Sequence, residues 1–479
     1  MDPHLLNDAL MLLALQGVMG AFDTIYHHEL GVALPARRGA QTELRLHALR
    51  ALLYGVLFAF MAWLRPHGIW VALPAVVIVV EIGLTLRDFV IEDRTRLLPA
   101  SERVTHTLLA VNGGALFALY GLQLLAWSGQ ASGLTMASAT PLVWVLTAMA
   151  VGVAASGIRD AFAAHRLSNL DAAFNPFIGQ PFQRVLVTGG TGFIGEALVN
   201  ALIEAGQAVT VLARSPRHAA MQFNGRARVV SRLEDLHVDE AFDVVVNLAG
   251  APVVGPRWSA ARKAVLLKSR VGTTEALGAW CARSRHAPAL WVQASAIGYY
   301  GVRPHSERLT EQSPPDGSFM STLCADWEAA AKSALPADTR QVVLRLGVVF
   351  GPGGALPQLL RPYYFGLGGR LGDGRQSFSW VHRDDVLAMI ARAMHDPQMA
   401  GIYNATAPEC PTQAEFACCA SRVLRRPLLC TVPAAPVRLL LGEMAQLFFD
   451  GQHVVPTRLL ESQFTYRFPT LESALRQEA

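Results

Sequence analysis

A run of glycines between a strand-like and a helix-like segment is the clearest chemical signal in the sequence. The apolar run 184–188 leads into Gly189-Gly-Thr-Gly-Phe-Ile-Gly195, and a helix-like stretch follows at 196–205. Glycines at these spacings allow a tight turn, let the backbone approach a pyrophosphate and let helix and strand pack closely, with the helix N-terminus facing the phosphates. The pattern therefore predicts a dinucleotide-binding site. Its predicted contacts are Gly189, Gly192, Phe193, Ile194 and Gly195.

The residues after the second predicted strand, 208–213, indicate which dinucleotide binds. A site for NAD(H) carries Asp or Glu there to bond the ribose 2′-hydroxyl. This chain instead has Arg214, followed by Ser215, Pro216 and Arg217, with no acid within reach. A guanidinium suits a 2′-phosphate, so NADP(H) is favoured over NAD(H). The alternative is that Arg214 is a solvated loop residue.

The elements that must position these residues are further buried strands. Strand-like runs occur at 243–247, 290–295 and 341–346. Leu248 and Ala249 follow the first of them and should lie along the cofactor, whereas Ser295 ends the second and leads to Tyr299. Strands that alternate with helices predict a Rossmann-like, doubly wound parallel sheet of the α/β class. Because ligands bind at the carboxyl ends of such strands, Ser295 and its neighbours are expected at the substrate site.

The first third of the chain is far more apolar than the rest. Five segments approach the length of about 20 apolar residues that crosses a bilayer, and they are 5–22, 46–64, 68–86, 104–127 and 141–158. Arginines gather after the first, third and fifth segments, and are almost absent from the other two loops. The positive-inside rule then places the N-terminus outside and everything after the fifth segment in the cytoplasm. We therefore expect a multi-pass protein of a bacterial-type inner (plasma) membrane with a cytoplasmic Rossmann domain.

Ionisable residues lie close to the predicted membrane boundary. Glu43 and His47 are four residues apart, as are Glu102 and His106, so each pair shares one helix face on the cytoplasmic side. Such pairs can supply metal ligands in a helical bundle. More often such residues cap helices and meet lipid headgroups, and on the sequence alone we predict no metal site. Glu81, inside an apolar run, is expected to face the bundle interior.

Composition excludes other classes of protein. The formal net charge is only +4 and no run of five basic residues occurs, so nucleic-acid binding has no support. The six cysteines all lie at position 281 or beyond, without a CxxC or a zinc-site spacing. They are expected to be reduced thiols in a cytosolic domain.

The predicted organisation has four parts. We expect a transmembrane region of about five spans at 1–160, a linker at 161–182, an NADP-binding Rossmann domain at 183–405 and a small C-terminal substrate or closing domain at 406–479. The oligomeric state is not predicted.

Several longer motifs can be compared with known families. They are Val187-Thr-Gly-Gly-Thr-Gly-Phe-Ile-Gly195, Val246-Asn-Leu-Ala-Gly250, Gln293-Ala-Ser-Ala-Ile-Gly-Tyr-Tyr-Gly301, Leu323-Cys-Ala-Asp-Trp-Glu328, Arg345-Leu-Gly-Val-Val-Phe-Gly351, Trp380-Val-His-Arg-Asp-Asp385 and Tyr403-Asn-Ala-Thr-Ala-Pro408. With them the chain from 184 to 476 resembles the extended, epimerase-like short-chain dehydrogenase/reductases, in particular an atypical branch of epimerase family proteins. The resemblance does not extend to the membrane region. It implies a Rossmann fold and a nicotinamide dinucleotide cofactor.

The catalytic pair of that family is missing. Its usual members carry Tyr-x-x-x-Lys on the helix after the fifth strand, and no Tyr-x-x-x-Lys occurs in this chain. At the matching helix stand Cys324 and Glu328, one turn apart. A neighbouring carboxylate raises the pKa of a thiol, so Glu328 is the better candidate for proton transfer.

Two functions remain open. The first is a membrane-anchored NADP(H)-dependent oxidoreductase or epimerase for a small polar or lipid-linked substrate, in which Ser295 orients a carbonyl and Glu328 or Tyr299 is the acid/base. The second is a catalytically inactive NADP(H)-binding sensor or scaffold at the membrane. The missing Tyr-x-x-x-Lys pair favours the second. The strand-end residues and the motif with His382 and Asp385 favour an enzyme.

Overall fold

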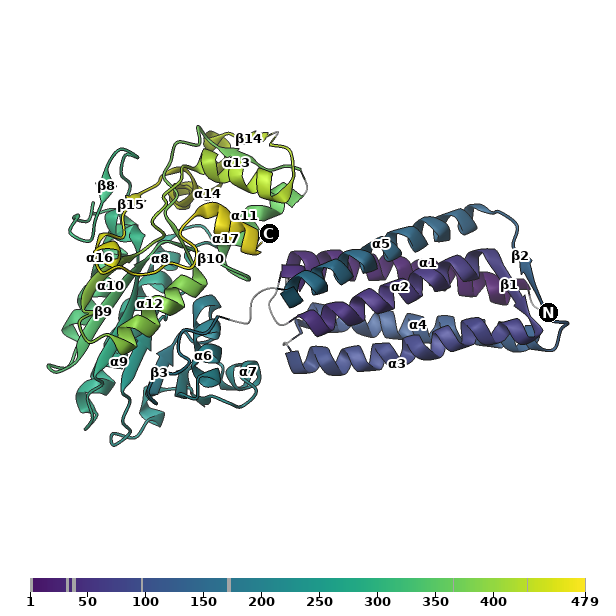
Figure 1. Cartoon of the computed structure of the whole chain (residues 1–479), viewed down its shortest axis with the longest axis horizontal. Helices are drawn as coiled ribbons and strands as arrows, with labels where there is room; N and C mark the ends of the chain where they lie inside the picture. Colours follow the sequence, from purple (N-terminus) through teal and green to yellow (C-terminus); the bar gives the residue numbers. More distant parts are fainter. Residues whose placement is uncertain are drawn as a thin grey trace. The chain divides into compact units, whose positions relative to one another are not determined.

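The computed structural model describes residues 3–31, 34–36, 40–95, 98–169, 174–364, 366–428 and 430–478. The chain divides into two compact units, Met1–Ala172 and Ala173–Ala479. Figure 1 shows the helices of the first unit and the sheet of the second. Each unit is described by itself.

Long apolar helices make up the first unit (Figure 1). They are α1 (Pro3–Phe22), α2 (Gln41–Trp63), α3 (Ala72–Thr95), α4 (Ala100–Ser128) and α5 (Pro141–Asn169). A π-helical turn, η1 (Asp23–Gly31), continues α1, and β1 (Leu64–His67) pairs antiparallel with β2 (Gly133–Met136). Five helices of the described chain are long and apolar enough to cross a membrane by length and composition. The predicted number of apolar helices is therefore confirmed, and their insertion in a membrane stays a prediction.

The helices extend beyond the predicted apolar segments at one end of the unit. α2 begins at Gln41 and α5 continues to Asn169. The added turns carry charged residues, such as Glu43 and Asp160, that are buried within the unit. A hydropathy pattern misses these turns because their polar side chains point inward. The predicted linker at 161–182 is corrected accordingly, since residues 161–169 belong to α5.

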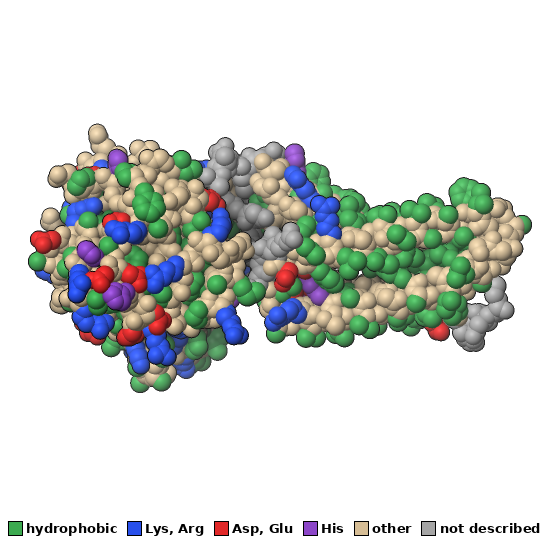
Figure 2. Space-filling view, turned by 90° about the horizontal axis from the view of Figure 1, so that it is seen from below, with side chains coloured by type: hydrophobic (Ala, Val, Ile, Leu, Met, Phe, Trp, Pro, Cys, Tyr) green, Lys and Arg blue, Asp and Glu red, His purple; other side chains and the backbone are tan. Residues whose placement is uncertain are grey.

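Apolar side chains fill the interior of the helical unit and also cover its outside. Leu13, Phe58, Leu116 and Leu146 belong to the buried core. Large apolar side chains on α3, α4 and α5 remain exposed, among them Val79, Val111, Leu125 and Val151. Figure 2 shows hydrophobic side chains along most of this unit, with most of the visible charged ones at one end. Helices that are apolar all round are typical of membrane segments.

A seven-stranded parallel sheet forms the centre of the second unit, in the order β13-β9-β7-β6-β3-β4-β5. Its strands are β3 (Arg184–Thr188), β4 (Ala208–Leu212), β5 (Arg228–Val230), β6 (Val244–Asn247), β7 (Leu290–Ala296), β9 (Arg340–Leu346) and β13 (Gly401–Ala405). The strand order reverses between β3 and β6, and such a switch point is where doubly wound folds bind ligands. The predicted Rossmann-like class is confirmed, with β5 and β13 as strands whose positions the sequence analysis did not predict.

Helices cover both faces of the sheet because successive strand residues point to opposite sides. Val185 and Val187 of β3 share an apolar core with α6 (Phe193–Glu204) and α12 (Arg383–His395). Leu186, between them, packs in another core with α9 (Thr273–Arg283). The helix α10 (Phe319–Ser333) contacts both α9 and β7. Ligands of such folds bind at the carboxyl ends of the strands, here those of β3, β6 and β7.

The C-terminal segment packs within the same compact unit as the sheet. Its helices α13 (Gln413–Leu424) and α17 (Leu471–Glu478) share an apolar core with α11 (Ala355–Tyr364). Three short parallel pairs lie outside the sheet: β8 (Arg308–Leu309) with β15 (His453–Val454), β10 (Val348–Phe350) with β12 (Trp380–His382) and β11 (Gly369–Leu371) with β14 (Cys430–Val432). The remaining helices are α7 (Pro216–Gln222), α8 (Ala260–Leu267), α14 (Ala434–Leu441), α15 (Gln446–Phe449) and α16 (Thr457–Glu461). Residues 406–479 are thus tied to the rest of the unit at several points.

Candidate functional site

The glycine-rich loop joins the end of β3 to the start of α6. Gly189 has a φ of +69°, and a Cβ there would lie 2.6 Å from the backbone of Leu248. A Cβ at Gly195 would lie 2.2 Å from the carbonyl oxygen of Gly189. Gly192 is the N-cap of α6, so the unpaired first N–H groups of this helix open onto the loop. The loop therefore has the close backbone approach and the helix N-terminus that a pyrophosphate needs.

The other predicted cofactor residues lie beside this loop. The amide of Leu248 donates a hydrogen bond of 3.1 Å to the carbonyl of Thr188, the last residue of β3, and Ala249 follows directly. Phe193 and Ile194 form the first turn of α6. The backbone walls contributed by β3, β6 and α6 fit the phosphate and ribose part of a dinucleotide.

Arg214 lies just beyond the carboxyl end of β4. It is exposed, and Ser215 after it is the N-cap of α7. In this fold the side chain at that position contacts the 2′ group of the cofactor ribose. The structure thus leaves the guanidinium accessible to a ligand at the predicted place.

A buried polar network holds the ends of three strands in register. Asn247 of β6 accepts a hydrogen bond of 2.5 Å from Thr188 of β3 and donates one of 2.9 Å to Gln293 of β7. Its amide also donates to Thr274 of α9 at 2.8 Å. All four side chains are buried. The sequence analysis missed this network, although polar residues within apolar strand runs were a signal for it.

Ser295 and Glu328 meet at the carboxyl end of β7, where a third residue joins them. The Ser295 hydroxyl donates a hydrogen bond of 2.6 Å to Glu328 Oε1. Arg345, opposite Ser295 on the neighbouring β9, donates to both oxygens of Glu328, each at 2.8 Å. Burial by itself lowers the pKa of Arg345, but the hydrogen bonds and charge of Glu328 outweigh it and raise that pKa above its ordinary value. The pair is therefore a charged, bidentate contact, and Glu328 already accepts three hydrogen bonds.

Arg345 also organises the two tyrosines after β7. Its Nη1 donates to the Tyr300 hydroxyl at 3.0 Å, which in turn donates to Asn404 of β13 at 2.6 Å. Its guanidinium lies 3.4 Å from the ring centroid of Tyr299. Burial raises the pKa of Tyr300 to about 12. Tyr299 is half-buried, and its hydroxyl has no hydrogen-bond partner among the described residues.

Cys324 belongs to the interior. It is 2% exposed, on the buried side of α10. Burial first, and the charge of Glu328 second, raise the pKa of its thiol to about 12. The sequence argument gave the right direction, but burial is the larger cause. A protonated, enclosed thiol is poorly suited to nucleophilic chemistry.

His382 and Asp385 hold the C-terminal segment in place. The sequence analysis took their motif as favouring an enzyme. The His382 Nε2 lies 3.0 Å from Glu478 Oε1, and its Nδ1 caps α12. Asp385 accepts hydrogen bonds from the backbone amides of Arg467 and Phe468, at 2.7 and 3.2 Å. Both side chains are buried. Their contacts are those of structural residues.

These features define a dinucleotide-binding α/β protein, and comparison with known proteins identifies its family. The model of the NAD dependent epimerase/dehydratase family matches residues 185–405, and a domain of unknown function (DUF1731) matches residues 432–478. The chain is 39% identical over 302 residues to the epimerase family protein SDR39U1 of Bos taurus, covering 61% of this chain and 99% of that protein. It is 33% identical over 297 residues to the epimerase family protein YfhF of Bacillus subtilis, covering 61% and 97%. The chain belongs to the NAD dependent epimerase/dehydratase family.

Solved structures agree with this assignment. The crystal structure of human epimerase family protein SDR39U1 (isoform2) with NADPH is 36% identical, covers 62% of this chain and 99% of that one, and has a TM-score of 0.56. A nucleoside-diphosphate sugar epimerase from Corynebacterium glutamicum is 28% identical, with a TM-score of 0.50, and covers 67% and 62%. The second unit is therefore an epimerase/dehydratase-family fold that binds a nicotinamide dinucleotide.

Proposed function

We propose that the protein is a membrane-anchored, NADP(H)-dependent oxidoreductase or epimerase acting on a small polar or lipid-linked substrate. The observation that carries this proposal is the meeting of Ser295, Tyr299 and the Glu328–Arg345 pair at the carboxyl end of β7. The glycine-rich loop lies at the same edge of the sheet, two strands away. A dinucleotide on that loop would supply hydride transfer.

The preference for NADP(H) rests on Arg214. Its exposed guanidinium follows β4, no acid stands near it in sequence, and it can pair with a 2′-phosphate. The relative solved with NADPH supports the same cofactor. The family description names NAD, so the two cofactors need a direct comparison.

The roles of the polar residues follow from their hydrogen bonds. Glu328 is a positioning residue, because its oxygens already hold Ser295 and Arg345. Tyr299 is the proton donor or acceptor, since its hydroxyl is free of partners among the described residues and its ring is fixed against Arg345. Ser295 orients a substrate oxygen from the strand end. This assignment chooses Tyr299 from the two acid/base candidates that the sequence left open.

The membrane anchor is the first unit. Its five long helices expose large apolar side chains along their length, which is costly in water and favourable in lipid. Arginine placement supports an N-terminus outside and a second unit in the cytoplasm of a cell with a bacterial-type inner membrane. A lipid-linked substrate would reach the site from the same membrane.

Substitution of Tyr299 tests the reaction. The purified full chain should oxidise NADPH with a fraction of a cell extract, and Tyr299→Phe should lower that turnover by roughly 10²–10⁴, the usual contribution of general acid–base catalysis. NADPH affinity should stay unchanged, because Tyr299 follows β7, whereas the predicted cofactor contacts follow β3 and β6. Tyr300→Phe is the matched control, since its hydroxyl is used internally by Arg345 and Asn404.

The rival function has its own signature. A sensor or scaffold would bind NADPH tightly and turn over no substrate, and the closed Glu328–Arg345 pair in place of Tyr-x-x-x-Lys favours it. NADPH binding without turnover on any extract fraction would decide for the sensor. If the Tyr299→Phe variant stays active, the protein is still an enzyme, but Tyr299 is not its acid/base.

A further inference from the structure

The helical unit buries a cluster of histidines and carboxylates at the end where α1, α3 and α5 finish and α2 and α4 begin. We refer to this set as the His–carboxylate cluster. Its members are Asp23 and His28 of η1, Glu43 and His47 of α2, Asp88 and Glu92 of α3, and Glu102 and His106 of α4. The carboxylates are at most 6% exposed, and the histidine side chains at most 11%. Charged groups are this deeply buried only when strong partners compensate them.

Helical spacing presents these side chains in pairs. Glu43 and His47 stand one turn apart on α2, as do Asp88 and Glu92 on α3, and Glu102 and His106 on α4. Residues four apart lie on the same helix face. Because neighbouring helices run in opposite directions, the end of α3 meets the beginnings of α2 and α4. Glu92 is thereby placed between His47 and His106.

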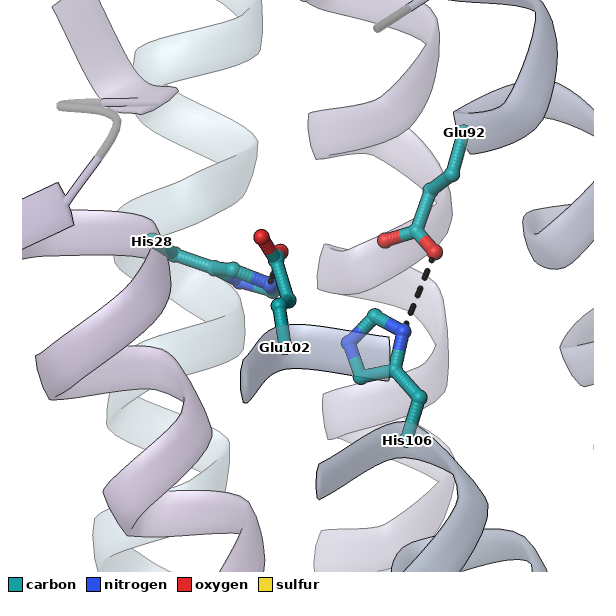
Figure 3. Close-up of side chains that lie close together, drawn as sticks. All are labelled: His28, Glu92, Glu102 and His106. Carbon is teal, nitrogen blue, oxygen red and sulfur yellow. Dashed lines mark ion pairs between the residues drawn. The ribbon is translucent and has the colours of Figure 1, made fainter. Parts of the chain in front are cut away.

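The potential ligand atoms form two groups that share Glu92. In the first group, one atom each from His28, Glu92, Glu102 and His106 lie within 4.8 Å of one another (Figure 3). The second group consists of Glu43, His47 and Glu92, with the same limit. Glu92 turns Oε2 toward His106 Nδ1, at 3.3 Å, and Oε1 toward His47 Nε2, at 3.6 Å. One carboxylate with an oxygen for each of two histidines has the arrangement of a bridging ligand.

The distances within the cluster fit ligands around an ion. His28 Nε2 lies 3.6 Å from Glu102 Oε1 and 3.5 Å from Asp23 Oδ2, and it makes no hydrogen bond. His106 Nδ1 likewise makes none, at 3.3 Å from Glu92. Two atoms that each lie about 2.1 Å from one metal at a tetrahedral angle are separated by about 3.4 Å. These contacts are too long or too poorly directed for hydrogen bonds and have the separation of two ligands of one ion.

A supporting carboxylate orients one of the histidines. The Nε2 of His106 lies 3.2 Å from Asp23 Oδ2, within hydrogen-bond distance, and this leaves Nδ1 facing Glu92. A metal-bound histidine almost always gives its other ring nitrogen to a carboxylate or a carbonyl. Asp88 bonds Arg50 at 2.5 Å through Oδ2, while its buried Oδ1 has no hydrogen bond. Polar atoms without hydrogen bonds thus point into the cluster from more than one helix.

The charges of the cluster also favour a metal-binding site. The cluster holds five carboxylates against three histidines, with Arg50 beside them. Among the side chains of the cluster itself, the carboxylates thus outnumber the histidines, and Arg50 also contacts Glu81 of α3. Two divalent ions together with Arg50 would match the charge of the five cluster carboxylates if the histidines are neutral. Histidine and carboxylate ligands without thiolates are those of first-row transition metals in helical bundles.

We propose that the His–carboxylate cluster binds two divalent first-row transition-metal ions, with Glu92 as the bridging ligand. His28, Glu102 and His106 complete the first ion's ligands, and Glu43 and His47 those of the second. The proposal is independent of the NADP(H) chemistry, because every ligand belongs to the helical unit. The cluster would lie at the cytoplasmic end of that unit.

Metal loading of the purified full chain tests the site, with Mn(II) as the probe. After chelation and reloading, the wild type should retain about two Mn(II) per chain, and the two ions should give a spin-coupled electron paramagnetic resonance spectrum because they lie about 4 Å apart. Glu92→Gln should lose both ions, and His28→Gln should lose one. Circular dichroism of each variant establishes that the helices are intact.

Two buried residues outside the cluster provide matched controls. Glu81→Gln removes a carboxylate of α3 that contacts Arg50 and Thr85, and His27→Gln removes a histidine next to His28 that contacts Thr105. Both variants should retain about two Mn(II) per chain, as the paired-metal site predicts. The proposal is overturned if the wild type retains no stoichiometric Mn(II), if a single uncoupled ion binds, or if the controls lose as much metal as Glu92→Gln.

Discussion

The two units bury ionised side chains in opposite ways. In the α/β unit, Glu328 and Arg345 form a bidentate pair whose oxygens and nitrogens reach Ser295 and Tyr300 as well. In the helical unit, His28 and His106 face carboxylates at 3.6 and 3.3 Å with ring nitrogens that make no hydrogen bond. The first arrangement is complete with protein atoms alone. In the second, His28 Nε2 and His106 Nδ1 have no hydrogen-bond partner among the described residues, and the proposed metal ions would supply a partner.

This difference distinguishes buried charged groups that have a structural role from buried charged groups that can bind a ligand. A buried ion pair is tolerated when geometry and extra hydrogen bonds compensate for lost hydration. A buried group with an unpartnered polar atom retains that cost and calls for an explanation. By this criterion Glu328 positions its neighbours, whereas the His–carboxylate cluster is the proposed metal site. The same comparison separates the enclosed Tyr300 from the half-buried Tyr299.

The largest expected effect is all-or-none and concerns the placement of the two units in the cell. A reporter fused after Ala479 should be active only in the cytoplasm, and one inserted near Gly133, in the β1–β2 region, only outside. Arginine placement in the loops is the reason. Activity of both reporters on one side of the membrane would contradict the five-span arrangement and the cytoplasmic position of the cluster.

The stability of the protein should be sensitive to the loss of one partner of the buried Glu328–Arg345 pair. Arg345→Met leaves Glu328 buried and uncompensated, so the free energy of unfolding should fall by about 3–5 kcal/mol. Urea unfolding of the full chain, followed by tryptophan fluorescence, measures it. Glu328→Gln combined with Arg345→Met should recover much of the loss, because no unpaired charge remains.

A surface pair in the same unit supplies the control for that measurement. Arg184 and Asp243 contact each other at 3.3 Å with side chains 49% and 37% exposed. Arg184→Met should therefore cost less than about 1 kcal/mol. Equal losses in Arg184→Met and Arg345→Met would mean that the buried pair has no special role in the fold.

A smaller effect is expected at the cofactor site. Arg214→Ala should weaken NADPH binding by about 1.5–3 kcal/mol, the value of a hydrogen bond to a charged group, and leave NADH binding unchanged. Calorimetric titration with both cofactors measures the difference. Arg217→Ala, an exposed arginine of α7, is the control. Equal losses of binding free energy for the two cofactors would mean that Arg214 is a solvated loop residue.

The smallest effect concerns Cys324. Its pKa is raised by burial to about 12, so the thiol stays protonated from pH 7 to 9 and the reactive thiolate appears only at higher pH. Iodoacetamide should modify the exposed Cys418 rapidly and Cys324 slowly over that range, as mass spectrometry can follow. Cys324→Ser should change turnover by less than about two-fold, since a protonated thiol takes no part as a nucleophile. Rapid alkylation of Cys324 at pH 7 would refute its enclosed, protonated state.

Local sequence patterns determined the elements of both units. The glycines between 189 and 195 could be interpreted because a turn, a close backbone approach and a helix start are properties of neighbouring residues. Apolar runs marked β3, β4, β6, β7 and β9, and longer runs marked the helices of the first unit. Spacing of four residues also identified the pairs Glu43–His47 and Glu102–His106, which proved to belong to one cluster.

The tertiary structure decided how residues on separate elements meet. Arg345 contacts Glu328 because β9 pairs with β7 and α10 packs against β7, and no residue spacing in the sequence predicts that contact. Glu92 joins the two histidine pairs because α3 returns antiparallel between α2 and α4. Periodicity reports which face of an element a side chain occupies, but only the packing of several elements determines the partner it meets. For this protein that packing turned isolated ionisable residues into a closed ion pair in one unit and an open ligand set in the other.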